Sequence, residues 1–226
     1  MAKPSAETPR LYDARFSREE RMRKERVWRV LGPFFQAWIP ESSDILDIRC
    51  GFGEFLNNVR GRRRIGIDLN PQAREYLDGE IEFRCGDVRD LSAIGDESFD
   101  CVFCSNLLEH LESKQAVEAL ARDVARILRA GGQFIIMGPN CRLLPGAYWD
   151  FWDHHVAITE RSLSELLRAT GFSIENLFAR FLPYTTKGAL PARPWLVRFY
   201  LNMPIVWPLF GRQFLIRARK SGGSKS

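Results

Sequence analysis

The sequence predicts an α/β fold in which a mainly parallel β-sheet is covered by helices on both faces. Short apolar strands alternate with helical segments between residues 45 and 138, and the first strand runs directly into a glycine-containing turn at residues 49–53. Strands that alternate with helices favour a parallel sheet. The 226 residues suit one sizeable core, and 45% hydrophobic with 27% charged residues is the balance of an ordinary globular protein.

The individual elements follow from local patterns. Helices are expected from about residue 54, from Pro71 and over 114–129, where apolar side chains recur on one face before Gly131-Gly132. A later helix over 160–170 has Thr159 as its N-cap. The predicted strands are 45–48, 65–68, 81–85, 99–105, 133–138, 172–180 and 213–219.

Two regions are predicted. Residues 1–40 form an N-terminal basic helical cap: residues 1–16 are loose, Ser17 caps the helix, and Gly32-Pro33 kinks or splits it. Residues 41–226 form the main domain, with an aromatic loop at 141–155 and an aromatic insertion at 186–211. No signal peptide is visible, and charged residues and prolines interrupt the apolar stretch 196–210, so we expect a cytoplasmic protein without a membrane span.

The positive charge is concentrated at the two ends. The net charge is +5; residues 1–30 hold nine Lys/Arg and five Asp/Glu, and residues 212–226 hold five Lys/Arg and no acid. Basic ends bind nucleic acid or an anionic membrane surface, or they are a solvated helix face and a tail. The sequence lacks the Asn/Asp-Pro-Pro-aromatic motif of base-methylating enzymes, so nucleic acid is not the expected partner.

Five cysteines at irregular spacing do not form a disulfide framework. Cys101 and Cys104 lie in a predicted strand, where side chains three apart point to opposite faces. We therefore expect them to pack in the core and not to share a metal.

The glycine turn indicates a nucleoside ligand without a phosphate at this point. A dinucleotide-binding turn needs glycine at positions 49, 51 and 54, where this chain has Arg49, Gly51 and Glu54. A glutamate at the helix start repels a pyrophosphate, which argues against a nicotinamide oxidoreductase. S-adenosylmethionine fits better, because its methionine end carries an ammonium and a sulfonium.

One acidic residue stands at or after each of the first three strands: Asp47, Asp68 and Asp87. Asp68, 21 positions after Asp47, is placed to accept both ribose hydroxyls. Asp87 is placed to reach an adenine amino group. Turn capping explains any one of these acids, but it explains all three together with the glycine turn less well.

These motifs resemble the class I S-adenosylmethionine-dependent methyltransferases. Residues 46–53 are similar to the family's first motif, 66–68 to its second, 86–88 to its third, 99–111 to its fourth, and 128–132 to the turn before its fifth strand. The resemblance implies a Rossmann-like seven-stranded sheet in the order 3-2-1-4-5-7-6 with the last strand antiparallel. The positions implied for the cofactor are Asp47, Arg49, Cys50, Gly51, Gly53, Asp68, Leu69, Asp87, Val88, Asn106 and His110.

Arg49 departs from the family pattern, which usually has glycine there. We expect its side chain to pair with the methionine carboxylate of the donor. The alternative is that Arg49 crowds the cofactor, which would make the chain a non-catalytic binding module with the methyltransferase fold.

All three histidines fall near the carboxyl ends of the fourth and fifth strands: His110, His154 and His155. Ligands bind at this edge in open α/β sheets. His155 is the first candidate for the base that deprotonates an acceptor hydroxyl, and His154 is the second. The alternative for either ring is a hydrogen bond to a loop carbonyl. His110 is expected to shape the cofactor pocket. The two later histidines with Asp150 and Asp153 match no strong metal pattern, so no metal is expected.

The expected activity is methylation of an oxygen on a small-molecule, sugar or lipid-linked acceptor. The whole chain also resembles a bacterial subgroup linked to sugar and polyketide tailoring, through residues 146–150 and 181–184. The aromatic residues of 148–152 and 195–210 either wall the acceptor or pack the core. With the basic ends, the second group is also a candidate for peripheral contact with the inner face of the membrane. No residue pattern specifies an oligomeric state.

Overall fold

The computed structural model describes residues 18–184 and 193–222, and it contains a seven-stranded sheet in the order β3-β2-β1-β4-β5-β7-β6. The strands are β1 (Asp44–Ile48), β2 (Arg63–Asp68), β3 (Glu82–Cys85), β4 (Phe99–Ser105), β5 (Leu128–Pro139), β6 (Phe172–Phe178) and β7 (Gln213–Lys220). The first five strands pair in parallel, whereas β7 is antiparallel to both β5 and β6. The predicted strand order and the antiparallel last strand are therefore confirmed.

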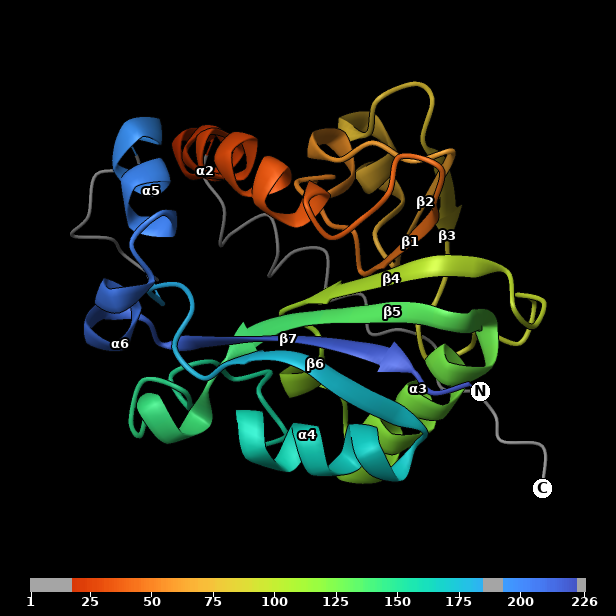
Figure 1. Ribbon diagram of the computed structural model, residues 1–226. Helices are drawn as coiled ribbons and strands as arrows, with labels where there is room; N and C mark the ends of the chain where they lie inside the picture. Colours follow the sequence, from red (N-terminus) through yellow and green to blue (C-terminus); the bar gives the residue numbers. More distant parts are fainter. Residues whose placement is uncertain (1–17, 185–192, 223–226) are drawn as a thin grey trace.

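Helices cover both faces of this sheet (Figure 1). The α-helices are α2 (Arg18–Gln36), α3 (Lys114–Ile127), α4 (Glu160–Ala169), α5 (Pro194–Leu201) and α6 (Trp207–Phe210). Short 3-10 helices are η1 (Leu56–Asn58), η2 (Pro71–Tyr76), η3 (Leu108–His110), η4 (Cys141–Leu143) and η5 (Pro204–Val206). Among the described residues, no helix is both long and apolar enough to cross a bilayer.

Each face of the sheet buries its own apolar core. Cys104 and Val117 belong to the core under α3 and α4, and Cys101 and Phe35 belong to the core under α2 and α6. Successive side chains of a strand point to opposite faces, so β4 contributes to both cores. The prediction that Cys101 and Cys104 point apart into packed cores is confirmed.

Helix α2 packs closely on the segment that follows the glycine turn. A Cβ atom on Gly32 would lie 2.2 Å from the Asn58 carbonyl oxygen, so only glycine permits this approach. Pro33 lies inside the helix near its end, and the predicted split is absent. A proline near a helix end removes a single backbone bond, which the packing of α2 on the sheet offsets.

The helix expected from residue 54 is only a turn followed by η1. The Asn58 side chain donates to the Glu54 carbonyl at 2.8 Å, and the Asn57 side chain donates to the Tyr76 carbonyl at 2.7 Å. Asparagine side chains that bond the backbone in this way compete with a regular helix. The segment beginning at Pro71 is likewise a 3-10 helix, with the Asn70 side chain accepting from Gln72 N.

Two other helix boundaries follow local signals. Thr159 and Ser162 form a capping box that starts α4, as predicted for Thr159, and Gly171 follows its end with φ of 93°. Helix α3 begins at the N-cap Ser113 and ends at Ile127, two residues before the predicted end. Of the insertion 186–211, residues 193–211 are described and form α5, η5 and α6; residues 186–192, like residues 1–17, lie outside the described residues.

Candidate functional site

The glycine turn after β1 has an unusual backbone. Arg49, Gly51 and Gly53 all have positive φ, at 71°, 55° and 74°. A Cβ on Gly53 would lie 2.7 Å from the Leu77 side chain and 3.0 Å from that of Asn57, so glycine is required there for space as well as for conformation. Such a turn leaves bare backbone at the carboxyl edge of β1, where a ligand approaches an α/β sheet.

Asp68 fastens this turn to the end of β2. One carboxylate oxygen accepts the Gly51 amide at 2.9 Å, and the other accepts the Asn70 amide at 2.9 Å. A carboxylate has about four acceptor positions, so these two bonds leave acceptor capacity for ribose hydroxyls.

The turn is surrounded by acids. Asp47 is buried, and burial, followed by the charges of Glu54 and Asp68, raises its pKa well above the usual value. Glu54 accepts the Phe52 amide at 3.1 Å, and its carboxylate lies 3.9 Å from the Lys24 amine. A turn surrounded by acids suits a ligand that carries ammonium and sulfonium groups, because a nearby cation stabilises the ionised carboxylates, and it disfavours a pyrophosphate.

The remaining cofactor candidates differ in exposure. Asp87 is held by the Arg89 side chain at 2.5 Å, and this bond lowers the pKa of the Asp87 carboxyl. Val88 and Cys50 are buried, whereas Leu69 is exposed. Any base contact of Asp87 thus competes with an existing ion pair.

Arg49 crosses from the glycine turn to the end of β4. Its guanidinium donates to the carbonyl oxygen of Asn106, a residue that also has positive φ (49°). The Asn106 amide is itself fixed by the Met137 carbonyl at 2.9 Å. Burial raises the pKa of Glu109 and lowers that of His110; the charge of Arg49 partly opposes the rise at Glu109 and adds to the lowering at His110. Arg49 therefore lies between the expected cofactor site and the histidines.

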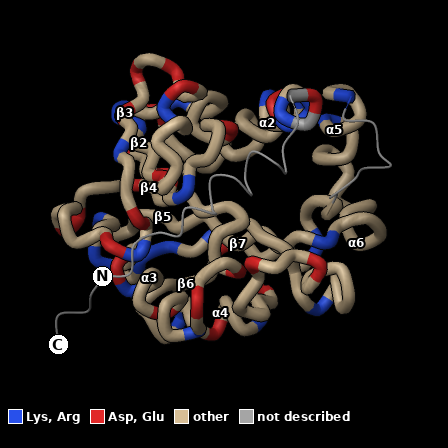
Figure 2. Tube along the Cα trace, turned by 180° about the vertical axis from the view of Figure 1, so that it is seen from behind, with Lys and Arg blue, Asp and Glu red and all other residues tan. Residues whose placement is uncertain are grey.

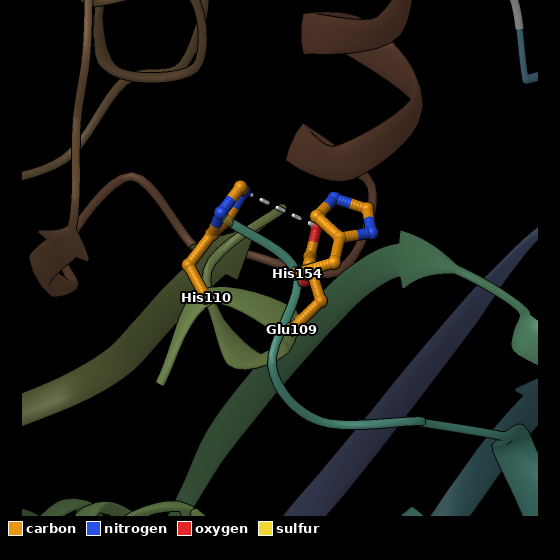
Figure 3. A group of neighbouring side chains, drawn as sticks. All are labelled: Glu109, His110 and His154. Atoms are coloured by element: carbon orange, nitrogen blue, oxygen red, sulfur yellow. Dashed lines mark ion pairs between the residues drawn. The ribbon is translucent and has the colours of Figure 1, made fainter. Parts of the chain in front are cut away.

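His110 and His154 meet Glu109 at the same edge of the sheet (Figure 3). Glu109 Oε1 lies 3.9 Å from His110 Nε2, and the two imidazole rings are 4.9 Å apart at 84°. Burial raises the pKa of Glu109 to about 7 and lowers that of His110 to about 4. Burial therefore favours the uncharged forms of Glu109 and His110.

The neighbouring histidines of the aromatic loop have different surroundings. His154 is buried, with its ring 4.8 Å from that of Tyr148 and stacked at 4.9 Å on Phe151. His155 is exposed, and its backbone amide donates to the Glu109 carbonyl at 2.8 Å. Both candidate bases therefore lie next to Glu109, one inside the protein and one at its surface.

Glu109 was not singled out from the sequence, in which only the two later histidines with Asp150 and Asp153 were considered as a metal group, and that group was not favoured. Within residues 18–184 and 193–222, the group with metal-ligand potential is Glu109, His110 and His154. The Leu-Glu-His-Leu stretch after β4 could have indicated Glu109, because an acid next to a histidine at the end of a strand is a common feature of functional sites.

Some aromatic residues of the loop are buried and pack inside the protein, and others are exposed at its surface. Tyr148 is fully buried, and its hydroxyl donates to the Val156 carbonyl at 2.5 Å and accepts the Ile158 amide at 3.2 Å. Trp149 and Trp152 are exposed. Tyr148 thus holds the loop in place, and only the tryptophans present apolar surface to the outside.

The sheet order and the acid-lined glycine turn together define the class I methyltransferase architecture. The family model described as "Methyltransferase domain" matches residues 46–136. Among solved structures, a Haloferax volcanii putative methyltransferase in complex with the activator Trm112 aligns with a TM-score of 0.66 and 20% identity, covering 91% of this chain and 94% of that one. The PH0226 protein from Pyrococcus horikoshii aligns with a TM-score of 0.64 and 21% identity over 98% and 100% of the two chains.

Curated relatives agree with this architecture. The ubiquinone biosynthesis O-methyltransferase of Xanthomonas axonopodis pv. citri is 27% identical over 68% of this chain and 73% of its own length. A probable S-adenosylmethionine-dependent methyltransferase of Mycolicibacterium smegmatis is 29% identical over 61% and 55%. Against the Xanthomonas oryzae ubiquinone biosynthesis O-methyltransferases, the match spans less than half of either protein. Residues 46–136 thus form a methyltransferase domain of the class I S-adenosylmethionine-dependent type, and these similarities imply S-adenosylmethionine as the cofactor.

Proposed function

We propose that the protein methylates an oxygen of a small-molecule, sugar or lipid-linked acceptor. The observation that carries this proposal is the position of Glu109 and the histidines, which lie beside Arg49 at the strand ends next to the glycine turn. An oxygen acceptor must lose a proton, and titratable groups at this position suit that task. The names of the Xanthomonas relatives support oxygen as the methylated atom.

When bound, S-adenosylmethionine supplies a methyl group on a positively charged sulfur. In our proposal Asp47 favours the ammonium end of the donor through charge, and Asp68 accepts the ribose hydroxyls. Arg49 pairs with the donor carboxylate, in a geometry that a guanidinium supports well. Backbone atoms of Gly51 and Gly53 lie against the donor, and Leu69 and Val88 contact its base beside Asp87.

His155 takes the acceptor proton in this scheme, and His154 is the alternative. The exposed ring of His155 can pass a proton to water, whereas the ring of His154 is enclosed by Phe151, Tyr148 and His110. The backbone bond from His155 to Glu109 keeps this histidine at the edge where an acceptor would meet the donor.

Calorimetric titration with S-adenosylmethionine, its demethylated product and NADH tests the cofactor site. The native chain is expected to bind the first two and not NADH. Arg49→Gly is expected to bind the donor about tenfold more weakly, in line with the loss of one charge-assisted pair of about 1.5 kcal/mol. Arg49→Lys, which keeps the charge, is the matched control. Binding by Arg49→Gly alone would instead identify Arg49 as an obstruction and favour the non-catalytic module.

We further propose a peripheral contact between the α5–α6 segment and an anionic membrane surface, which would suit a lipid-linked acceptor. Exposed apolar side chains gather there, each between 52% and 80% exposed: Trp195, Phe199, Ile205, Leu209 and Phe210. In the sequence Arg193 precedes these side chains, Arg198 lies among them, and no Asp or Glu follows Glu175. Figure 2 shows basic positions on α5 and both basic and acidic positions on the neighbouring α2. An apolar segment that carries arginines and no acid of its own suits an anionic bilayer surface.

Flotation with phosphatidylglycerol-containing and pure phosphatidylcholine vesicles tests this contact. The native chain should float with the anionic vesicles only, and a Phe199→Ser/Leu209→Ser variant should not float. Met22→Ser, at an exposed apolar position on α2, is the control and should behave as the native chain. A native chain that stays in solution with both vesicles would refute the contact.

A further inference from the structure

We propose that Glu109, His110 and His154 bind one divalent transition-metal ion, in a site that faces the acceptor. Their ligand atoms, one from each side chain, all lie within 4.8 Å of one another. The three side chains come from η3 and from the loop after η4, and they point toward one another (Figure 3). The inference rests on the proposed function, because it names what the histidine edge of that site holds.

The hydrogen bond of His110 fixes which of its nitrogens faces the group. Nδ1 lies 3.0 Å from the Asp153 carbonyl oxygen, and a carbonyl only accepts, so Nδ1 carries the proton. The Asp153 carboxylate, 3.1 Å from the same nitrogen, strengthens this arrangement. The lone pair of Nε2 is therefore on the side of Glu109. Metal-ligating histidines are held in this way, with the other ring nitrogen donating to a carbonyl or carboxylate.

The group needs only a small contraction to coordinate an ion. Metal–ligand distances of about 2.1 Å put neighbouring ligand atoms about 3.0–3.4 Å apart, compared with the 3.9 Å between Glu109 Oε1 and His110 Nε2. All the ligand atoms lie within 4.8 Å of one another, so the side chains must close by roughly 1–2 Å at most. The surroundings also limit other movements, because Tyr148 and Phe151 pack against the His154 ring.

The ligand set selects the type of metal. Two imidazoles and one carboxylate suit Zn²⁺, Fe²⁺ or Mn²⁺, whereas Mg²⁺ prefers oxygen ligands. The charge of Arg49 is close to Glu109 and opposes a cation, while the Glu109 and Asp153 carboxylates favour it. Three protein ligands leave coordination positions open, and an acceptor hydroxyl bound there would lose its proton more readily. His154 would then be a ligand, which leaves His155 as the base.

Calorimetric titration of chelator-treated protein with Zn²⁺ and, separately, Mg²⁺ tests the site. A Cys85→Ser background removes an exposed thiol that would bind Zn²⁺ independently. We expect one Zn²⁺ per chain and far weaker Mg²⁺ binding. Glu109→Gln and His154→Gln should each weaken Zn²⁺ binding by at least about tenfold, because each removes a ligand. His155→Gln, the adjacent exposed histidine, is the matched control and should bind Zn²⁺ as the background does.

Two parallel measurements keep the outcomes separate. The thermal unfolding midpoint shows whether each variant is folded, and donor titration tests the proposed function on the same samples. Three results would overturn the metal site: the native chain does not bind Zn²⁺, both ligand variants are folded and still bind it, or Mg²⁺ binds equally well. If the donor still binds in those cases, the methyltransferase function stands; loss of donor binding in the native chain would count against the function itself.

Discussion

The Asp68 carboxylate accepts the Gly51 amide at 2.9 Å, and this bond joins the end of β2 to the glycine turn that follows β1. The two strands are neighbours in the sheet, so the bond fixes the turn against a rigid element. The same carboxylate also fixes Asn70 at the start of η2. One side chain thus positions two loops of the proposed cofactor site.

Asp68→Ala is expected to lower the free energy of unfolding by about 1.5–3 kcal/mol, because it leaves two amides without their charged acceptor. Donor affinity should fall at least about tenfold, corresponding to about 1.4 kcal/mol. Urea unfolding and donor titration measure the two effects. Asp90→Ala, which removes a surface carboxylate bonded to Ser92, is the control and should change neither. Unchanged donor affinity in Asp68→Ala would refute the ribose role.

Gly53→Ala should destabilise the fold by about 1–3 kcal/mol, since alanine is strained at positive φ, and its Cβ would press on Leu77 and Asn57. Donor binding should weaken with it, because the turn must shift. Gly79→Ala is the matched control: a Cβ there meets nothing within 4 Å. Equal unfolding free energies for the two variants would contradict the required positive φ.

Asp44 provides a pH-dependent part of the stability. Hydrogen bonding to Arg62, with Arg129 beside it, holds the Asp44 pKa at about 2, below the usual 3.8. A lowered pKa stabilises the fold above pH 3.8, and the contribution is lost as the pH falls through 2. The shift corresponds to at most about 2 kcal/mol.

Urea unfolding of the native chain and Asp44→Asn across pH checks this contribution. The difference between them should be near its maximum at pH 6 and should fall to roughly half at pH 3. A difference that stays constant with pH would show that the ion pairs of Asp44 are not its source.

Tyr148→Phe should cost about 1–3 kcal/mol, because it leaves the Val156 carbonyl and the Ile158 amide without their buried partner. Thermal and urea unfolding measure the loss. Tyr76→Phe removes only a surface hydroxyl that accepts from Arg21 at 3.3 Å, and it should change stability by less than about 0.5 kcal/mol. Equal effects in the two variants would mean that Tyr148 does not hold the aromatic loop.

His155→Ala is expected to reduce methyl transfer about 10²–10⁴-fold while leaving donor affinity unchanged, as removal of a general base does. Retained turnover in His155→Ala with loss in His154→Ala would assign the proton transfer to His154.

The strands were predictable because each is a short apolar run that ends in a turn, and the parallel arrangement followed from their alternation with helices. The prediction of a helix after the glycine turn was wrong, because the Asn58 side chain takes the Glu54 carbonyl that a regular helix would use, and the Asn57 side chain bonds the distant Tyr76 carbonyl. That competition depends on the position of Tyr76, which the sequence alone does not supply.

The sequence predicted those candidate site residues that stand directly after a strand. It did not predict the group that forms where two distant segments of the chain meet. Glu109 is buried. Its neighbour His110 bonds Asp153, which lies in a loop 43 residues further along the chain. The two neighbouring histidines looked equivalent in the sequence, and only the packing of Tyr148 and Phe151 separates the buried ring from the exposed one.

Strands β6 and β7 pair antiparallel, and the α5–α6 segment connects them outside the sheet. Lengthening or exchanging such a connection changes loop-closure entropy only slowly and leaves the strand register in place. The turn that we propose binds the donor lies at the opposite half of the sheet, at the ends of β1 and β2. If the α5–α6 segment contacts the membrane that holds the acceptor, as we propose, related chains can therefore change their acceptors by changing this segment while they keep the same methyl donor.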